Sequence, residues 1–232
     1  MKKAPTNKTT LADTLVEQIR KAIITGEFQP GERINIKELT VKYGVSETPL
    51  RTALNRLLAE NLIDNYPRQG MRVRPINIET CRETFELRRM MELYYADKMT
   101  KAYSIDVSFQ RALANNLSTH NELISNFPQD ISFDDYMQSY NIDMAFHSML
   151  LTCACNKMLM SVYNSLNPFQ YIYYVYDRQS REKLLSGVDE HKRIIEALES
   201  GDSELVKAQL AAHLDAASDS IITILKISGF NS

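Results

Sequence analysis

The chain has 232 residues and a mass of 26.6 kDa, a size that suits one large domain or two modest ones. Hydrophobic residues make up 44% and charged residues 24%, which excludes a disordered chain, a collagen and a disulfide scaffold. Only 7 Gly and 7 Pro interrupt the chain, so a mostly helical fold is expected. The odd number of cysteines, 3, and the lack of any apolar run near the ~20 residues that a bilayer requires predict a soluble cytoplasmic protein without a membrane segment.

Charge is distributed unevenly along the chain, although the net charge is only -2. Residues 1–75 contain 13 Lys and Arg against 8 Asp and Glu, whereas residues 76–232 contain 14 against 21. We therefore expect a small basic domain over 1–75 and an acidic domain over 76–232. Excess basic charge on a small domain is typical of nucleic-acid binding, because neutralised phosphates release their counterions.

Three short helices are predicted in the first 60 residues. Thr10 followed by Asp13 resembles a capping box at the start of the first helix. A second helix is expected between Asn35 and Gly44, and Ser46 caps a third. The apolar face of the third helix consists of Leu50, Ala53, Leu54, Leu57 and Leu58. Two helices joined by a tight turn that contains glycine form a helix-turn-helix.

The polar face of the third helix has the chemistry that a major groove requires. Short or planar hydrogen-bonding side chains lie near its N-terminus, where recognition helices meet base edges. They are Glu47, Thr48, Arg51, Thr52 and Asn55.

A β-hairpin is predicted directly after this helix. Residues Leu62 to Tyr66 and Met71 to Arg74 alternate as two short strands, with Arg68 and Gln69 at the tip. Such a hairpin would be the wing of a winged helix-turn-helix. The alternative is a solvated helix face beside an ordinary surface hairpin, since helix-turn-helix units also serve roles that do not involve DNA.

The segment GERINIKELTVKYGVSETPLRTALNRLLAENLI, followed by RQGMRVRPI, resembles the winged helix of the GntR family of bacterial transcription regulators. The resemblance covers most of the N-terminal domain, including the Gly-Val-Ser turn and the glycine of the wing. It implies that Lys37, Ser46 and Arg51 contact the DNA backbone or bases, and that the wing tip, here Gln69 and Gly70, enters the minor groove.

One departure from the family pattern concerns the residue after Ser46. The family usually has Arg there, which donates two hydrogen bonds to guanine, whereas Glu47 can only accept, for example from cytosine N4. We therefore expect an operator that differs from the common family site, or a Glu47 side chain that is turned aside.

Residues 76–232 contain successive amphipathic segments, which predict an antiparallel bundle. Loop residues such as Ser186-Gly187 and Ser200-Gly201 separate the helices. The expected helices span residues 78–103, 108–127, 133–155, 158–166, 168–185, 189–200 and 202–227. The predicted fold class is therefore mostly α, with a winged helix-turn-helix of three helices and a small hairpin joined to an all-α bundle of six to seven helices.

Asp143 and His147 are four residues apart, which places a carboxylate and an imidazole on one helical face, as a metal chelate requires. His191 and His213 lie in later helices among apolar residues. Each histidine alone is more simply explained as a hydrogen-bonded core or surface residue. The fourth histidine, His120, has no partner at a useful spacing and is expected at the surface.

Four segments, FELRRMMELYYAD, DMAFHSMLLTCACN, DEHKRIIEALESGD and AAHLD, resemble in order and spacing the FCD ligand-binding domain of the FadR subgroup of GntR regulators. In many members of that subgroup one Asp and three His hold a divalent metal. The matching positions here are Asp143, His147, His191 and His213, and the resemblance implies zinc, with nickel or manganese as alternatives. Positions left open on such a metal can bind the carboxylate of a small organic acid.

The same resemblance implies that Arg88, in the motif Glu-Leu-Arg, lies over the effector pocket. A guanidinium suits a carboxylate effector because it donates two parallel charge-assisted hydrogen bonds. The alternative for Arg88 is a surface salt bridge with Glu92, four residues further along the helix.

Cys153 and Cys155 have the spacing of a soft-metal or redox pair. On one helix, however, their side chains would point about 200° apart, so both are expected to be core thiols. FCD domains commonly have glycine at the position of Cys155.

The sequence thus predicts a homodimeric, ligand-responsive repressor that binds a palindromic operator in double-stranded DNA and releases it when a small organic acid binds. A first alternative keeps the DNA-binding function but has a metal-free bundle with an apolar or fatty-acyl pocket. A second is a metal-dependent hydrolase, since one Asp and three His can activate water, although no general base or nucleophile is convincingly placed.

Overall fold

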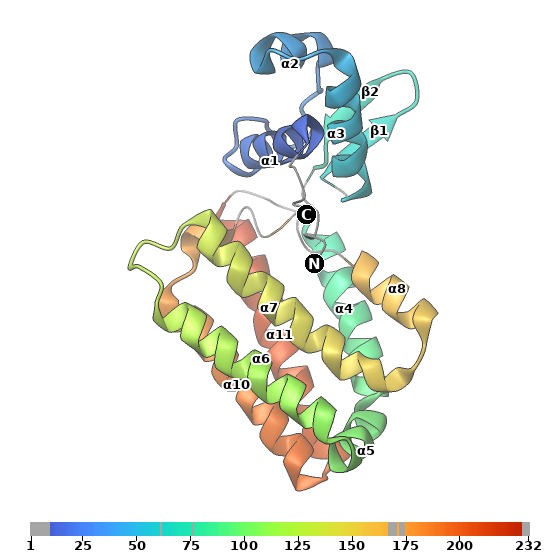
Figure 1. The fold of residues 1–232 in the computed structure, drawn as a ribbon, viewed down its shortest axis with the longest axis vertical. Coiled ribbons are helices and arrows are strands. Elements are labelled where there is room, and N and C mark those ends of the chain that lie inside the picture. The colour runs from blue at the N-terminus through green and yellow to red at the C-terminus, as the bar shows by residue number, and fades with distance from the viewer. Residues whose placement is uncertain (1–9, 61, 76, 167–170, 172–174, 229–232) are drawn as a thin grey trace, which may run out of the picture. The chain divides into compact units, whose positions relative to one another are not determined.

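A computed structural model describes residues 10–60, 62–75, 77–166, 171 and 175–228 (Figure 1). Its internal contacts divide the chain into two compact units, residues 1–76 and 77–232. The described residues of the first unit form three helices and a small hairpin, and those of the second unit form helices without any strand. The predicted fold class is therefore confirmed.

The N-terminal unit consists of α1 (Leu11–Ile24), α2 (Ile36–Tyr43), α3 (Glu47–Ala59), β1 (Ile63–Tyr66) and β2 (Gly70–Val73). Helices α1 and α3 pack against each other, and their core-facing side chains are almost fully buried. These side chains include Leu15, Ile19, Leu50, Leu54 and Leu57.

The ends of these helices follow the local capping chemistry. The Thr10 side chain accepts from the Asp13 N–H, and the Asp13 carboxylate accepts from the Thr10 N–H in return, which confirms the predicted capping box. Asn35 caps α2 by accepting from the Lys37 N–H, 3.1 Å away. Ser46 occupies the N-cap position of α3, but its side chain makes no capping hydrogen bond.

The hairpin is antiparallel, and Ile63 pairs with Val73 and Tyr66 with Gly70. At its tip the Gln69 N–H donates to the Tyr66 carbonyl over 3.1 Å, and Arg68 has a φ of 64°. Pro67 in the second position and a left-handed residue in the third are typical of a type II turn. The turn that joins the two strands of the wing is therefore explained by its local sequence.

The helices of the C-terminal unit form an antiparallel bundle in which α10 packs on α6 and α11, α11 on α4, and α6 on α7 (Figure 1). They are α4 (Ile78–Tyr94), α5 (Ala96–Ile105), α6 (Val107–Ser125), α7 (Phe133–Leu151), α8 (Lys157–Ser165), α10 (Arg181–Ser200) and α11 (Ser203–Ile227), with short 3-10 turns at Thr152–Ala154 and Tyr176–Arg178. No described helix of the chain is long and apolar enough to cross a membrane.

Several predicted helix boundaries in this unit are wrong. The helix expected over 78–103 breaks at Tyr95 into α4 and α5, and the buried face of α5 packs on α10 and α11. The break expected at Ser186-Gly187 does not occur, because α10 runs through it. A helical glycine costs only about 1 kcal/mol, and Leu184 and Val188 on either side of Gly187 pack into one apolar cluster. Residues 168–170 and 172–174 of the helix expected over 168–185 lie outside the described residues. The described part is not one helix, because the chain is extended at Gln179 and Ser180 and residues 181–185 belong to α10.

Helix α7 ends earlier than predicted, at Leu151, and a 3-10 turn leads to Cys155. Cys155 has a φ of 51° and is exposed, whereas Cys153 is half-buried. The expectation of two core thiols is therefore wrong for Cys155. Glycine adopts this left-handed conformation without a steric penalty, which agrees with the glycine that the resemblance to FCD domains implies at this position.

Candidate metal and effector site and DNA-binding surface

Four potential metal ligands from three helices come together inside the C-terminal bundle. Asp143 and His147 lie on α7, one turn apart, while α10 supplies His191 and α11 supplies His213. One ligand atom from each residue lies within 4.8 Å of all the others. The three histidines are buried, and only the Asp143 side chain is partly exposed, at 29%.

The Nε2 atoms of the three imidazoles point at one another. His147 Nε2 lies 3.0 Å from His213 Nε2 and 3.3 Å from His191 Nε2. Asp143 Oδ1 lies 3.3 Å from His191 Nε2. The His191 ring stacks on Phe146, with ring centroids 4.0 Å apart, which fixes its orientation from the other side.

Two glutamates, neither of which was expected from the sequence to contact a histidine, lie against the Nδ1 atoms on the opposite side of two of these rings. His147 Nδ1 lies 2.8 Å from Glu92 Oε2, and His213 Nδ1 lies 2.7 Å from Glu190 Oε2. Metal-binding histidines usually direct their second nitrogen to such a carboxylate. Glu190 directly precedes His191, but Glu92 lies 55 residues from His147, so no local spacing pointed to that pair.

The protonation of these groups can be derived from their surroundings. Burial acts to raise the pKa of Glu92, but His147 and the Arg88 guanidinium outweigh it and hold the pKa well below its usual range. Burial lowers the pKa of His147 and so favours its neutral form, against the opposing effect of Glu92. An ionised Glu92 can only accept, so the proton of His147 is on Nδ1 and its Nε2 has a free lone pair. Imidazole nitrogens in this state are the form that binds metal ions.

Arg88 is buried, with 4% of its surface exposed, and not on the surface as in the alternative considered from the sequence. Its Nε donates to Glu92 Oε1 over 3.3 Å, so the predicted i,i+4 ion pair does form, but inside the protein. Its Nη2 has no hydrogen-bond partner among the described residues. A buried guanidinium with unused donors is suited to bind an anion.

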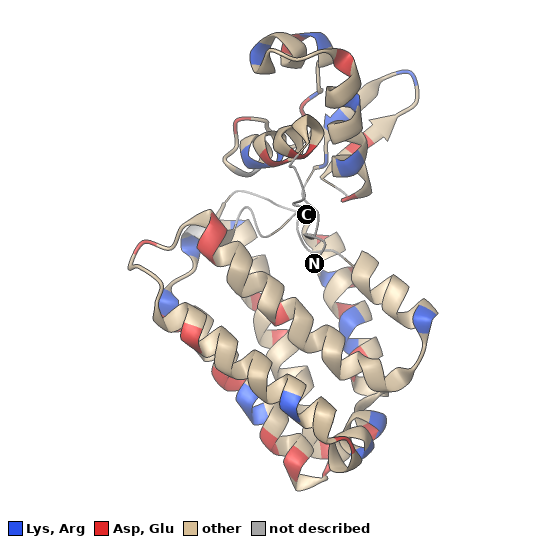
Figure 2. Cartoon of the chain, in the orientation of Figure 1, with Lys and Arg blue, Asp and Glu red and all other residues tan. Residues whose placement is uncertain are grey.

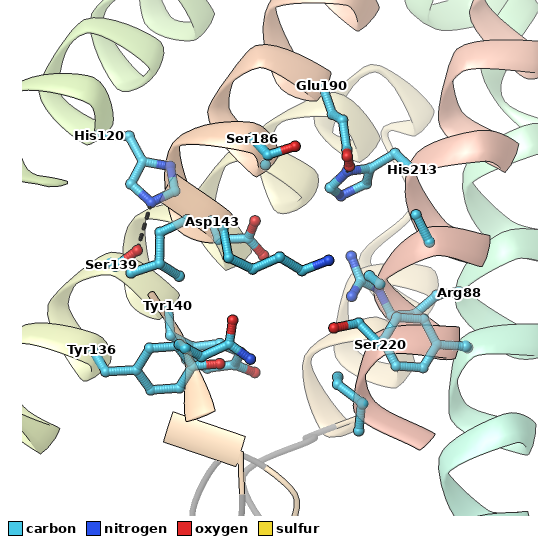
Figure 3. Close-up of a pocket in the computed structure, with 18 residues that line it drawn as sticks. Arg88, His120, Tyr136, Ser139, Tyr140, Asp143, Ser186, Glu190, His213 and Ser220 are labelled. Atoms are coloured by element: carbon cyan, nitrogen blue, oxygen red, sulfur yellow. Dashed lines mark hydrogen bonds and ion pairs between the residues drawn. The ribbon is translucent and has the colours of Figure 1, made fainter. Parts of the chain in front are cut away.

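A cavity of about 160 Å³ adjoins the metal-ligand cluster and is lined by side chains of α4, α6, α7, α10 and α11 (Figure 3). Arg88 and Asp143 point into it from facing sides, and Glu190 lies against His213. Hydroxyl groups contribute to the wall, together with a second cation, Lys183. They belong to Tyr136, Ser139, Tyr140, Ser186 and Ser220.

His120 was expected at the surface, and that expectation is wrong. It is 4% exposed and lines the cavity from α6, and its Nε2 lies 2.8 Å from Ser139 Oγ. The sequence shows no partner for His120 at helical spacing, because its partner Ser139 lies on the neighbouring helix α7. Burial lowers the pKa of His120, which favours the neutral form of this imidazole.

The residues predicted to contact DNA lie on the outside of the N-terminal unit. All of them are exposed except Gly70, which is half-buried. A hollow between the start of α2, the start of α3 and the wing is lined by Lys37, Glu47, Arg51 and Gly70. The other predicted contacts do not line it; they are Ser46, Thr48, Asn55, Arg68 and Gln69.

Glu47 does not stand free on the recognition helix. Its Oε2 accepts from Arg51 Nε at 3.1 Å and from Arg51 Nη2 at 2.9 Å. Two of the guanidinium donors that could read a base are therefore directed to Glu47. Arg33, which the sequence analysis did not identify, also lines the hollow, close to Gly70. Figure 2 shows that Lys and Arg on this unit are interspersed with Asp and Glu.

Comparisons with known proteins agree with both units. Residues 11–73 match the family described as bacterial regulatory proteins, gntR family, and residues 83–216 match the FCD domain. The Nta operon transcriptional regulator of Aminobacter aminovorans is 28% identical over 204 residues, which cover 88% of this chain and 90% of that protein. The gluconate operon transcriptional repressor of Bacillus subtilis is 21% identical over 209 residues, or 88% of this chain and 82% of that protein.

A solved structure shows the same fold. E. coli McbR/YncC superposes with a TM-score of 0.65 at 19% sequence identity, and the match covers 95% of this chain and 99% of that chain. The matched proteins are transcription regulators, so the hydrolase considered from the sequence is not supported. The chain belongs to the GntR family of bacterial transcription regulators, in the branch that joins a DNA-binding winged helix to an FCD domain.

Proposed function

We propose that this regulator is a homodimeric repressor that binds a palindromic operator and releases it when a small carboxylate binds beside a divalent metal. The metal site is proposed because one ligand atom from each of the three histidines and from Asp143 lies within 4.8 Å of the others. Neutral imidazoles that face each other through lone pairs repel, and a cation between them removes that repulsion. Nitrogen ligands with one carboxylate suit zinc, nickel or manganese, and zinc is the first choice.

The wall of the cavity supports a carboxylate effector over a fatty acyl chain. Arg88 and Lys183 supply positive charge, and hydroxyl groups accompany them. A bound metal would polarise the effector carboxylate, while Arg88 would orient it through Nη2, which has no partner among the described residues. Asp143, His147, His191 and His213 would hold the metal.

The metal content of the purified protein tests the proposed metal site. Elemental mass spectrometry of protein purified without chelator should find about one equivalent of metal per chain, lost in His191→Ala. His120→Ala is the matched control, because His120 lines the same cavity but is outside the four-residue cluster. Metal-free wild-type protein would favour the alternative with an apolar pocket.

Selection of operators from a random DNA library tests the proposed dimer and its palindromic binding site. Enrichment of an inverted repeat supports the dimer, and a single half-site contradicts it. A panel of small organic acids should then release the selected operator from the wild-type protein. Arg88→Gln should need a concentration about 10 to 100 times higher, because a charge-assisted hydrogen-bond pair is lost.

A further inference from the structure

Glu92 is the centre of a buried polar cluster that joins α4, α7 and α8. Its Oε2 accepts from His147 Nδ1 over 2.8 Å, and its Oε1 accepts from the Tyr163 hydroxyl over 2.7 Å and from Arg88 Nε over 3.3 Å. Glu92, His147 and Tyr163 are 0% exposed, and Arg88 is 4% exposed. Water therefore does not compete for this carboxylate.

The three partners of Glu92 belong to different parts of the regulator. His147 is a candidate metal ligand, Arg88 lines the effector cavity, and Tyr163 lies on α8. Arg88 Nε also lies 3.2 Å from the Tyr163 hydroxyl, so the two groups that hold Oε1 contact each other. A change at one partner alters how the negative charge is shared with the others, because hydrogen bonds in a buried network polarise one another.

We propose that Glu92 is the positioning residue that couples the metal site to Arg88 and to helix α8. This inference rests on the proposed metal site. Glu92 keeps the proton of His147 on Nδ1, which leaves Nε2 free for the metal and makes it more basic. Tyr163 and Arg88 fix the carboxylate in turn. The affinity for metal therefore depends on Tyr163, a hydroxyl whose partners are Glu92 and Arg88 and not the metal ligands.

Zinc affinity of the full chain, measured by competition with a chromogenic chelator, tests this coupling. Glu92→Gln should weaken zinc binding by about 10- to 100-fold, the usual effect of losing such a carboxylate. Tyr163→Phe should weaken it by about threefold to tenfold, since one hydrogen bond to Glu92 is lost. Tyr163→Phe in the Glu92→Gln background should cause no further loss, because its effect passes through Glu92.

Tyr103→Phe is the matched control. The Tyr103 hydroxyl donates to Glu199 over 3.0 Å, a tyrosine–glutamate pair outside the cluster, so its removal should leave zinc affinity unchanged. Long-range ¹H–¹⁵N spectra of the histidines give a second readout. The metal-free wild-type protein should show the Nδ1–H tautomer of His147, and Glu92→Gln should shift it toward Nε2–H.

Unchanged zinc affinity in Tyr163→Phe, or an equal loss in both backgrounds, would overturn the coupling while the proposed metal site still stands. If His191→Ala retains zinc, the metal site itself is wrong. If Glu92→Gln does not fold, Tyr163→Phe and its Tyr103→Phe control decide alone, because each removes only a hydroxyl.

Discussion

The Nε2 atoms of His147 and His213 face each other at 3.0 Å in the buried interior of the C-terminal bundle. The Nδ1 atom of each ring lies against a glutamate. When both Nδ1 atoms donate a proton to these carboxylates, the two Nε2 atoms face each other as lone pairs. The rings are also nearly parallel, with an interplanar angle of 23°. The arrangement is unfavourable for two neutral imidazoles and favourable around a cation.

Removal of metal should therefore destabilise the protein. A ligand that binds only the folded state at about 1,000 times its Kd contributes about 4 kcal/mol, and for a chain of this size the midpoint of thermal unfolding should fall by roughly 10 °C. Melting curves recorded with and without dipicolinate would measure this change. His213→Ala should melt at the same temperature in both conditions. An equal effect of the chelator on wild type and variant would show that it acts elsewhere.

Glu47→Gln should change the base preference of the regulator at one position of each operator half-site. The substitution removes the carboxylate that accepts two hydrogen bonds from Arg51, which then becomes available to a base. A bidentate contact discriminates bases by about 1–3 kcal/mol. Binding to a panel of single-base operator variants, followed by fluorescence anisotropy, would reveal the shift.

Glu17→Gln is the control for charge, because Glu17 pairs with Arg20 on α1, which Glu60 also holds, and is not among the residues predicted to contact DNA. Both substitutions remove one negative charge and should strengthen non-specific binding alike. An identical base preference in wild type and Glu47→Gln would show that the pair does not affect recognition.

Cys155→Gly should stabilise the protein by about 1 kcal/mol, because a residue with a side chain is strained in the left-handed region. The φ of Cys155 is 51°, and its side chain is exposed, so little packing is lost. Urea unfolding would measure the change. Cys155→Ser retains the strain and should lie within about 0.5 kcal/mol of wild type. A less stable glycine variant would contradict the explanation.

The stability contributed by Asp13 should disappear in acid. Hydrogen bonds from Thr10, and then from Arg56, lower the pKa of the Asp13 carboxyl from its usual value of 3.8. A lowered pKa in the folded state stabilises the protein above pH 3.8, and this contribution is lost as the pH falls toward the folded-state pKa. Wild type should therefore be more stable than Asp13→Asn at neutral pH, and the two should converge below pH 3.8. A difference that stays constant with pH would refute this assignment.

Local rules were sufficient for much of the fold. The capping box at Thr10, the hairpin around Pro67 and the shared face of Asp143 and His147 each depend on residues within a few positions of one another. Interactions over such distances are determined by backbone geometry alone. The predictions from local sequence were wrong where tertiary packing outweighed local preferences. Helix α10 continues through Gly187 because both of its sides pack into one cluster, which outweighs the weak helical preference of glycine.

The candidate site was likewise predicted in part from the sequence and in part revealed only by the structure. Residue types, spacing and family resemblance pointed to the four candidate ligands and to Arg88. Tertiary structure alone decided that Arg88 is buried, that His120 lines the cavity, and that Glu92 joins His147 to Tyr163 across 55 and 71 residues of chain. The sequence determines which groups a helix presents on each face. Which faces meet depends on how all the helices pack together, and no local spacing encodes that.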